Sequence, residues 1–377
     1  MLETEKMQAA EGDILHDRAN AGLKYPKMTG NIALAGLLII VSIAALFIGR
    51  DPVDPVSVAK VLVSGVLEWA GGIIAAITGW RISLFWSIPH TWPAVVDTVV
   101  WGVRFPRIVA VILAGSGLAV SGATYQSVFR NPLVSESILG VSAGASVGAA
   151  LAILSGQNYL MIELWAFACG LLAVGATFAI SRVYRSNPTL VLVLAGIVVG
   201  SLFTAVTSLI KYVADPYTKL PDITFWLMGS FGSVTIDSVL PMIPIVIVCL
   251  VIVILMRWRL NVLTLGDEEA KSLGIDVNRT RLIVIVCATL MTAAAVCVGG
   301  LIGWVGLIVP HMARMVVGPD HKQMIIASIL IGGAYLLAMD TICRTVVSAE
   351  IPISIVTSIL GAPIFLIMLY KSKETWS

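Results

Sequence analysis

Ten runs of predominantly apolar residues divide this chain. They lie near 30–49, 105–126, 137–155, 161–181, 189–211, 239–256, 280–300, 303–317, 323–343 and 352–370. A helix needs about 20 such residues to cross the hydrocarbon core of a bilayer. The pattern therefore predicts an all-α, polytopic membrane protein with about ten transmembrane helices. The run at 303–317 is short and contains Pro310, His311 and Arg314, so we expect a partly buried or broken helix there, covered by protein.

Charged residues are too few for a water-soluble body of this size. They make up 12% of the 377 residues, and 58% of the residues are hydrophobic. A soluble domain carries about 25% charged residues, so most of this surface is expected to face membrane lipid. The net charge of +2 is too small to indicate a nucleic-acid partner.

The topology follows from the distribution of basic residues. Residues 1–28 are polar and of mixed charge, with no cleavage signal before the first run, so they are predicted to be a cytoplasmic tail. Residues 61–79 are ambiguous, because they are apolar but contain Glu68 and two adjacent glycines. Ten spans with cytoplasmic N- and C-termini place 16 of the 24 Lys and Arg residues inside, as expected for an inner-membrane protein.

This topology divides the chain into three parts: a tail (1–28), a transmembrane domain (29–371) and a short cytoplasmic C-terminus (372–377). Within the domain, 50–103 is predicted to be an extended external excursion. The sequence contains no polar stretch long enough to form a separate water-soluble domain. Residues 265–272 (LGDEEAKS) end in Lys-Ser but lack the glycines of a phosphate-binding loop. No metal-ligand spacing is present among the cysteines and histidines, so no cofactor, metal or catalytic residue is predicted for this chain.

Three polar segments interrupt the apolar pattern. Arg104 and Arg107 lie one helical turn apart at the outer mouth of the second run. They could pair with carboxylates of an external partner or extend to lipid headgroups. Arg130-Asn131-Pro132 is typical of a turn. Residues 263–277 predict a short helix with acidic residues at its start and Gly274 at its stop, which could insert into a groove of a cytosolic partner or simply connect two spans.

Glycines recur four residues apart at Gly140, Gly144 and Gly148. Such spacing lets helix backbones approach closely in lipid. It fits a bundle packed around a pathway, and it also fits ordinary helix packing.

Several segments, in order, resemble the FecCD-type permeases of ABC importers over roughly residues 30–371. The matching segments are Arg104–Arg107 (RFPR), Gly122–Gln126 followed by Arg130–Leu133 (GATYQ…RNPL), Ile138–Ala145 (ILGVSAGA), Trp226–Phe231 (WLMGSF), Leu265–Gly274 (LGDEEAKSLG), Gly303–Arg314 (GWVGLIVPHMAR) and Ile359–Pro363 (ILGAP). The chain departs from the family pattern at Val134-Ser135-Glu136, where Ala-Asp-Pro is commoner, and in the length of 50–103.

The resemblance implies a type II ABC importer permease fold, a second permease copy in a homodimer, two cytosolic ABC ATPase subunits that hold ATP and Mg, and an external substrate-binding protein. By motif position, the residues implied to dock the binding protein are Arg104, Arg107 and Arg344. Those implied to couple to the ATPase subunits are Leu265, Gly266, Asp267, Glu268, Glu269, Ala270, Ser272, Leu273 and Gly274. Motif and path-packing positions are Gln126, Arg130, Asn131, Pro132, Gly140, Gly144, Gly148, Pro310 and His311.

The implied cargo is a bulky metal chelate. A ferric siderophore comes first because it is the commonest cargo of the family, and haem or cobalamin is the alternative. An ion-coupled secondary transporter is the rival interpretation and predicts carboxylates in mid-span. Here Asp340 falls near the end of a run and Glu163 at a start, which disfavours the rival. An intrahelical pair of Asp340 with Arg344 is a structural alternative to docking.

Overall fold

The computed structural model describes residues 29–49, 53–78, 91–183, 188–347 and 349–373. The predicted N-terminal tail and residues 374–377 lie outside this described part. The elements are α2 (Thr29–Phe47), α3 (Pro55–Thr78), α4 (Ala94–Asp97), the π-helix η1 (Thr98–Arg104), α5 (Phe105–Phe129), α6 (Val141–Leu154), α7 (Tyr159–Val183), α8 (Pro188–Val213), α9 (Lys219–Met228), α10 (Ile236–Leu265), α11 (Asp267–Ser272), α12 (Val277–Gly299), α13 (Val305–Val317), α14 (His321–Thr345) and α15 (Ile353–Lys373).

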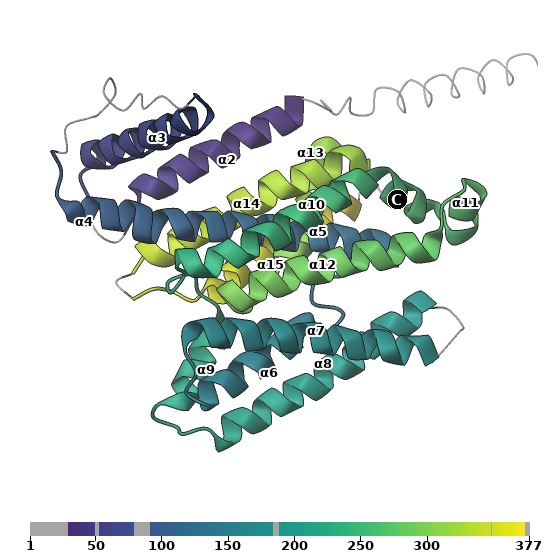
Figure 1. The fold of residues 1–377 in the computed structure, drawn as a ribbon. Coiled ribbons are helices and arrows are strands. Elements are labelled where there is room, and N and C mark those ends of the chain that lie inside the picture. The colour runs from purple at the N-terminus through teal and green to yellow at the C-terminus, as the bar shows by residue number, and fades with distance from the viewer. Residues whose placement is uncertain (1–28, 50–52, 79–90, 184–187, 348, 374–377) are drawn as a thin grey trace, which may run out of the picture.

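The all-helical, polytopic architecture is confirmed. Within the described ranges, seven helices are long and apolar enough to cross a membrane, and three shorter apolar helices cover 141–154, 305–317 and 353–368. Together they coincide with the ten predicted runs. Helices α9 and α11 are not among these candidate membrane spans. They lie at opposite ends of the bundle (Figure 1). These two ends are called the α9 end and the α11 end below.

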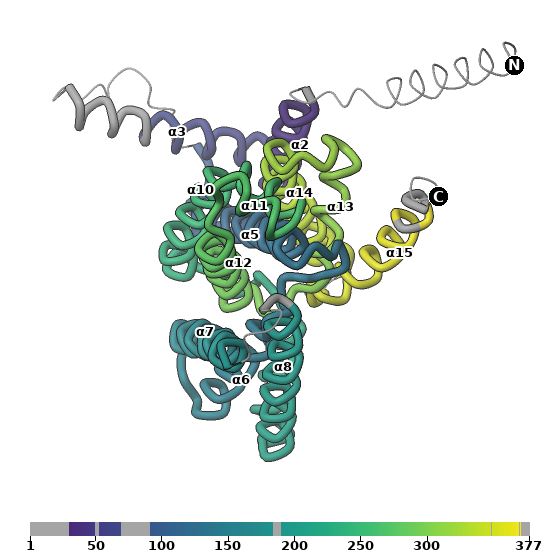
Figure 2. The backbone as a smooth tube through the Cα atoms, turned by 90° about the vertical axis from the view of Figure 1, so that its right-hand side faces the viewer, coloured from purple at the N-terminus to yellow at the C-terminus, as the bar shows by residue number. Residues whose placement is uncertain are grey.

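Helix α5 lies at the centre of the larger group of helices. It contacts α10, α12, α13 and α14, and most of its residues are buried. Helices α6, α7 and α8 contact one another and form a second group beside the first (Figure 2). Close packing within that group follows from its glycines. A Cβ at Gly148 would lie 2.1 Å from the carbonyl oxygen of Trp165 on α7, so the two backbones touch.

The second span begins earlier than the sequence predicted. One continuous apolar helical segment runs from Ala94 to Phe129, whereas the apolar run indicated a start near 105. The boundary was expected near Pro106, because proline has no backbone N–H to bond one turn back and commonly starts a helix. The seven-residue π-helical stretch η1 precedes it, and this wider winding lets the helix continue through the proline.

The described part of the excursion 50–103 contains the helix α3. It is packed through Val58 and Val61 against Trp92, Val96 and Val100.

The short helix α13 is broken from α12 rather than continuous with it. Gly300 (φ 71°) and Trp304 (φ 73°) both have left-handed backbone conformations, which reverse the chain between the two helices. Helix α13 has 13 residues, and Val305, Gly306, Ile308 and Val309 at its start are buried. This confirms the prediction of a short helix covered by protein.

Candidate functional site

A groove with both apolar and hydroxyl side chains in its lining lies between α6 and α8. Its volume is about 850 Å³. Its walls carry the small or hydroxyl side chains of Ser137, Ser142, Ser146, Ser201, Thr204, Thr207 and Ser208, together with Lys211. Lys211 and these hydroxyl groups give the groove polar surface among the helices α6 and α8. The groove is therefore a candidate site for a hydrophilic molecule.

Several hydroxyl groups of the groove bond to carbonyl oxygens of their own helices. Ser201 donates to the carbonyl oxygen of Ile197 at 2.8 Å, and Thr204 donates to that of Gly200 at 2.8 Å. Ser208 and Ser146 bond one turn back in the same way, at 3.0 and 2.8 Å. Because the donors are already used, the groove offers polar surface without strong fixed ligands. Such a wall suits passage better than tight binding.

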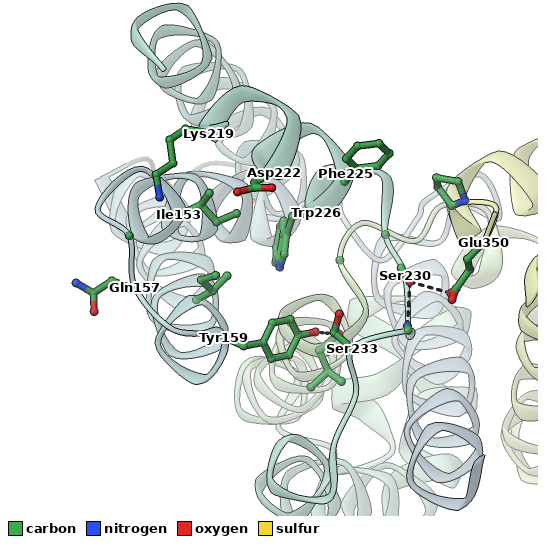
Figure 3. A pocket seen from close by; sticks show the side chains of 17 residues that line it. Ile153, Gln157, Tyr159, Lys219, Asp222, Phe225, Trp226, Ser230, Ser233 and Glu350 are labelled. Carbon is green, nitrogen blue, oxygen red and sulfur yellow. Dashed lines mark hydrogen bonds between the residues drawn. The ribbon is translucent and has the colours of Figure 1, made fainter. Parts of the chain in front are cut away.

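A second cavity, of about 650 Å³, lies at the α9 end (Figure 3). Its polar lining includes Tyr159, Lys219, Asp222, Ser230 and Glu350, with Trp226 beside them. Tyr159 donates to the carbonyl oxygen of Val298 at 3.3 Å, which joins α7 to the end of α12.

Two chain segments separate the two cavities. Leu227 and Leu301 line the groove, whereas the adjacent Trp226 and Gly300 line the α9-end cavity. The segments are bonded together, since Ser230 donates its N–H to the carbonyl oxygen of Gly299 at 3.0 Å. A Cβ on Gly300 would lie 2.5 Å from the carbonyl oxygen of Trp226. Directly packed backbone therefore lies between the groove and the cavity.

The three arginines predicted to dock a partner are buried near the α9 end. Arg104, Arg107 and Arg344 are 4%, 8% and 8% exposed. Arg107 pairs with Asp340 and Glu350, each at 2.7 Å. Arg344 donates to the carbonyl oxygen of Ala45 at 2.6 Å, and Arg104 donates to that of Leu46 at 2.6 Å.

These contacts bear on both interpretations of the arginines. The intrahelical pair of Asp340 with Arg344 is present but long, at 3.8 Å, and the principal partner of Asp340 is Arg107 on another helix. Docking of a binding protein to these arginines stays a prediction. Reversal of the charge of Arg107 would break its buried ion pair with Asp340 as well as any contact with an external partner. The sequence offered no signal for Glu350, which lies outside every apolar run.

The turn predicted at Arg130-Asn131-Pro132 is present. Arg130 has a left-handed φ of 50°, and the side chain of Asn131 accepts a hydrogen bond from the N–H of Leu133 at 2.9 Å. One turn earlier, Gln126 donates to the carbonyl oxygens of Val134 and Gly306 at 3.2 and 3.3 Å. The carbonyl oxygen of its amide accepts from Arg314 at 2.7 Å. The motif residues therefore join α5 to α13.

The predicted short helix over 263–277 is α11, shorter than that range. Gly274 (φ 76°) ends it as expected. The N–H groups of Gly274 and Ile275 bond to the carbonyl oxygens of Lys271 and Ala270, at 2.9 and 3.0 Å, in the manner of a glycine-terminated helix. Ala270 is buried, but Leu265 and Leu273 are 65% and 55% exposed. Of the remaining predicted coupling residues, Gly266 precedes α11 as its N-cap, and Asp267, Glu268, Glu269 and Ser272 lie on the helix.

The remaining predicted positions serve packing in this structure. Gly144 and Gly148 contact α7, whereas Gly140 faces Gly196 and Gly200 of α8 and lines the groove. Pro310 is buried in α13. His311 packs edge-on against Phe365 of α15, with ring centroids 6.4 Å apart.

Sequence reasoning also missed Glu136, which lies between α5 and α6. Its side chain is 4% exposed, and its Oε2 atom has no hydrogen-bond partner. A Cβ on Gly306 would lie 2.1 Å from that oxygen, so the carboxyl group is pressed against the start of α13. Burial raises the pKa of Glu136 to about 7, against the opposing effect of nearby backbone hydrogen bonds. The sequence did mark this position, because Glu136 stands where the family motif more often has proline. That departure did not indicate that the carboxyl group is buried.

Glu136 should make the stability of the fold depend on pH. Its pKa is raised from 4.5 to about 7 in the folded chain, so its contribution is complete below pH 4.5 and is lost as the pH rises to 7. Glu136→Gln stays neutral, and its melting temperature should not fall over that range. Thermal unfolding of both proteins in detergent at pH 4.5 to 8 measures the difference. Glu68→Gln, at an exposed carboxyl on α3, should follow the wild type; a Glu136→Gln curve parallel to the wild type would contradict the prediction.

Comparison with known proteins gives a consistent result. The model of the FecCD transport family matches residues 37–371. The molybdate import system permease protein of Haemophilus influenzae is 36% identical over 352 residues, which cover 93% of this chain and 97% of the relative. The cobalamin import system permease protein of Halobacterium salinarum is 40% identical, with 82% and 81% covered. A solved inward-facing metal-chelate type ABC transporter is 35% identical, with a TM-score of 0.77 and coverage of 92% and 100%.

Proposed function

The chain belongs to the FecCD transport family, and from that premise we propose that its cargo is a hydrophilic metal chelate, first of all a ferric siderophore, which passes along the groove between α6 and α8. The chain is the permease subunit of an ABC importer and has no ATPase domain of its own. Transport therefore requires an ATPase and a binding protein as partners. The single observation that carries the proposal is the hydroxyl-lined groove.

The size and lining of the groove support a chelate. Its volume of about 850 Å³ lies in the range of cavities for drug-sized ligands, roughly 300–1,000 Å³, and an oxyanion such as molybdate would fill little of it. Lys211 supplies one positive charge, which suits an anionic chelate. Molybdate is the second candidate, because the Haemophilus influenzae relative matches along 97% of its length. Haem and cobalamin remain alternatives without a lining feature that favours them.

A second copy of the chain is proposed to close the open side of the groove. Helix α8 leaves Leu194, Val198 and Leu202 exposed, at 52%, 64% and 62%, beside its hydroxyl face. A homodimer would bury these residues and enclose the path between two groove surfaces. The α11 end would face the cytosol, where two ATPase subunits would bind α11, and the α9 end would face outside.

The binding protein is proposed to dock at the α9 end around Arg104, Arg107 and Arg344. Their present partners are carbonyl oxygens, Asp340 and Glu350. Docking through them thus requires carboxylates of the binding protein to replace these intramolecular acceptors. The exposed wall of the α9-end cavity would then receive the cargo.

A bulky substitution in the groove tests the path. Gly200→Trp is expected to reduce ATP-dependent uptake to near background, because Gly200 lines the groove and only Gly140 lies near it. Gly175→Trp is the matched control, since a Cβ on Gly175 would meet nothing within 4 Å. Uptake of a ⁵⁵Fe-labelled siderophore and of ⁹⁹Mo-molybdate is measured in liposomes that contain the complete importer. Uptake of neither, or equal uptake by both variants, contradicts the proposal.

A further inference from the structure

Asp267, the first residue of α11, is shared by arginines from two other helices. Arg130, at the end of α5, binds its Oδ1 atom. Arg281 on α12 donates to both carboxylate oxygens, at 3.1 and 3.2 Å. Although partial burial acts to raise the pKa of Asp267, the charges and hydrogen bonds of Arg281 and Arg130 hold it below its ordinary value. The carboxylate is therefore charged and doubly paired.

Arg130 is itself held in place at a second point. Its Nε donates to the carbonyl oxygen of Leu263, in the last turn of α10, at 3.0 Å. Its backbone adopts a left-handed conformation as the C-cap of α5. The start of α11 is thereby attached to the ends of α5, α10 and α12 at one place, so a displacement of α11 that keeps these bonds displaces the three ends.

The hydrogen bonds continue from this point toward α13. The N–H of Asn131 bonds to the carbonyl oxygen of Gln126 at 3.1 Å. Gln126 contacts the carbonyl oxygen of Gly306 and the guanidinium of Arg314, at 3.3 and 2.7 Å. A consecutive set of polar contacts therefore joins α11, through the turn at Arg130, to both ends of α13.

The neighbouring acidic residue on α11 has no comparable contacts. Glu268 binds Lys271 on its own helix at 2.9 Å, and its side chain is 85% exposed. Asp267 instead bonds to Arg130 at the end of α5 and to Arg281 on α12.

We propose that Asp267 is a positioning residue that converts displacement of α11 into movement of α5 and α13. This inference rests on the proposed function, in which α11 receives the motion of the ATPase subunits. Without the paired carboxylate, α11 can still bind the ATPase, but its motion is no longer transmitted. The predicted defect is thus uncoupling of ATP hydrolysis from movement of the permease.

The test uses the complete importer in liposomes, with Ser201→Cys in the groove as a reporter. The measured quantity is the rate at which a hydrophilic maleimide labels this cysteine, with and without ATP and vanadate. In the otherwise unchanged permease, ATP should alter that rate by about fivefold or more. In Asp267→Asn, the ATP effect should fall below about twofold, while ATPase activity and co-purification of the ATPase subunits stay within about twofold of normal.

Two further variants complete the test. Asp267→Glu keeps the charge and should restore the ATP effect, and Asp237→Asn, at an exposed carboxyl of α10, should leave it unchanged. An intact ATP effect in Asp267→Asn would overturn the inference. So would loss of the ATP effect in proportion to lost ATPase binding, because Asp267 would then only attach the ATPase. If ATP alters labelling in none of the proteins, the proposed path fails instead of the linkage.

Discussion

Asp340→Ala should cost the folded permease about 3 kcal/mol, at the low end of the range for a broken buried ion pair, because Arg107 keeps Glu350 as its second carboxylate partner. The side chain of Asp340 is 2% exposed and that of Arg107 is 10% exposed. Arg107 binds Asp340 through Nε and a terminal nitrogen, at 2.7 to 3.1 Å. A melting curve of the purified protein in detergent measures the loss, and size-exclusion chromatography detects aggregation.

A double substitution separates burial of charge from simple loss of contacts. Arg107→Met with Asp340→Leu removes both charges and should recover most of the lost stability, since a hydrophobic pair of similar size can replace a buried ion pair. Glu350 keeps its hydrogen bond from Ser230, at 2.8 Å. Asp237→Ala, at an exposed carboxyl, should change stability by less than about 1 kcal/mol. Equal melting temperatures for Asp340→Ala and Asp237→Ala would show that the buried cluster contributes no net stability.

Gly122→Ala is expected to destabilise the contact between α5 and α13 by about 1–3 kcal/mol or more. A Cβ at Gly122 would lie 1.8 Å from the carbonyl oxygen of Gly306 and 2.6 Å from its Cα. Both are backbone atoms, so no side chain can rotate away, and the two helices must separate. Gln126 bonds to the same carbonyl group of Gly306, so this hydrogen bond should weaken as well.

Gly36→Ala is the matched control for that substitution. Gly36 is also a helical glycine, but a Cβ there would meet nothing within 4 Å. It should be neutral or stabilise the protein by roughly 0.5–1 kcal/mol, because alanine loses less conformational freedom than glycine in a helix. Thermal unfolding of both variants gives the comparison. A Gly122→Ala protein as stable as Gly36→Ala would mean that α13 is free to shift, contrary to its close packing here.

Local features of the molecule were predictable from the sequence. The ten apolar runs matched ten helices because span length depends only on a local stretch of apolar residues. The stop of α11 at Gly274 and the turn at Arg130 followed from the conformations that single residues prefer. The start of the second span was missed, since hydropathy does not register a π-helical stretch that carries a helix through Pro106.

The partners of the buried charges could not be predicted. Arg107 and Asp340 are 233 residues apart in the chain, and nothing near either residue indicates the other. The sequence suggested the local pair of Asp340 with Arg344 because residues four apart meet on one helix. Packing of α5 against α14 brings Arg107 closer, at 2.7 Å instead of 3.8 Å.

The amino-acid sequence alone was enough to predict the membrane environment, the approximate number of spans, the short helix between two of them and, through ordered motifs, the family. These depend on composition and on residues close together in the chain. The three-dimensional packing was needed to find that Arg104, Arg107 and Arg344 are buried, that Glu136 faces the start of α13, and that Asp267 contacts arginines from two neighbouring helices. Each of these depends on which helix faces which, and that is set by backbone contacts such as that of Gly122 with Gly306, formed between residues far apart in the chain.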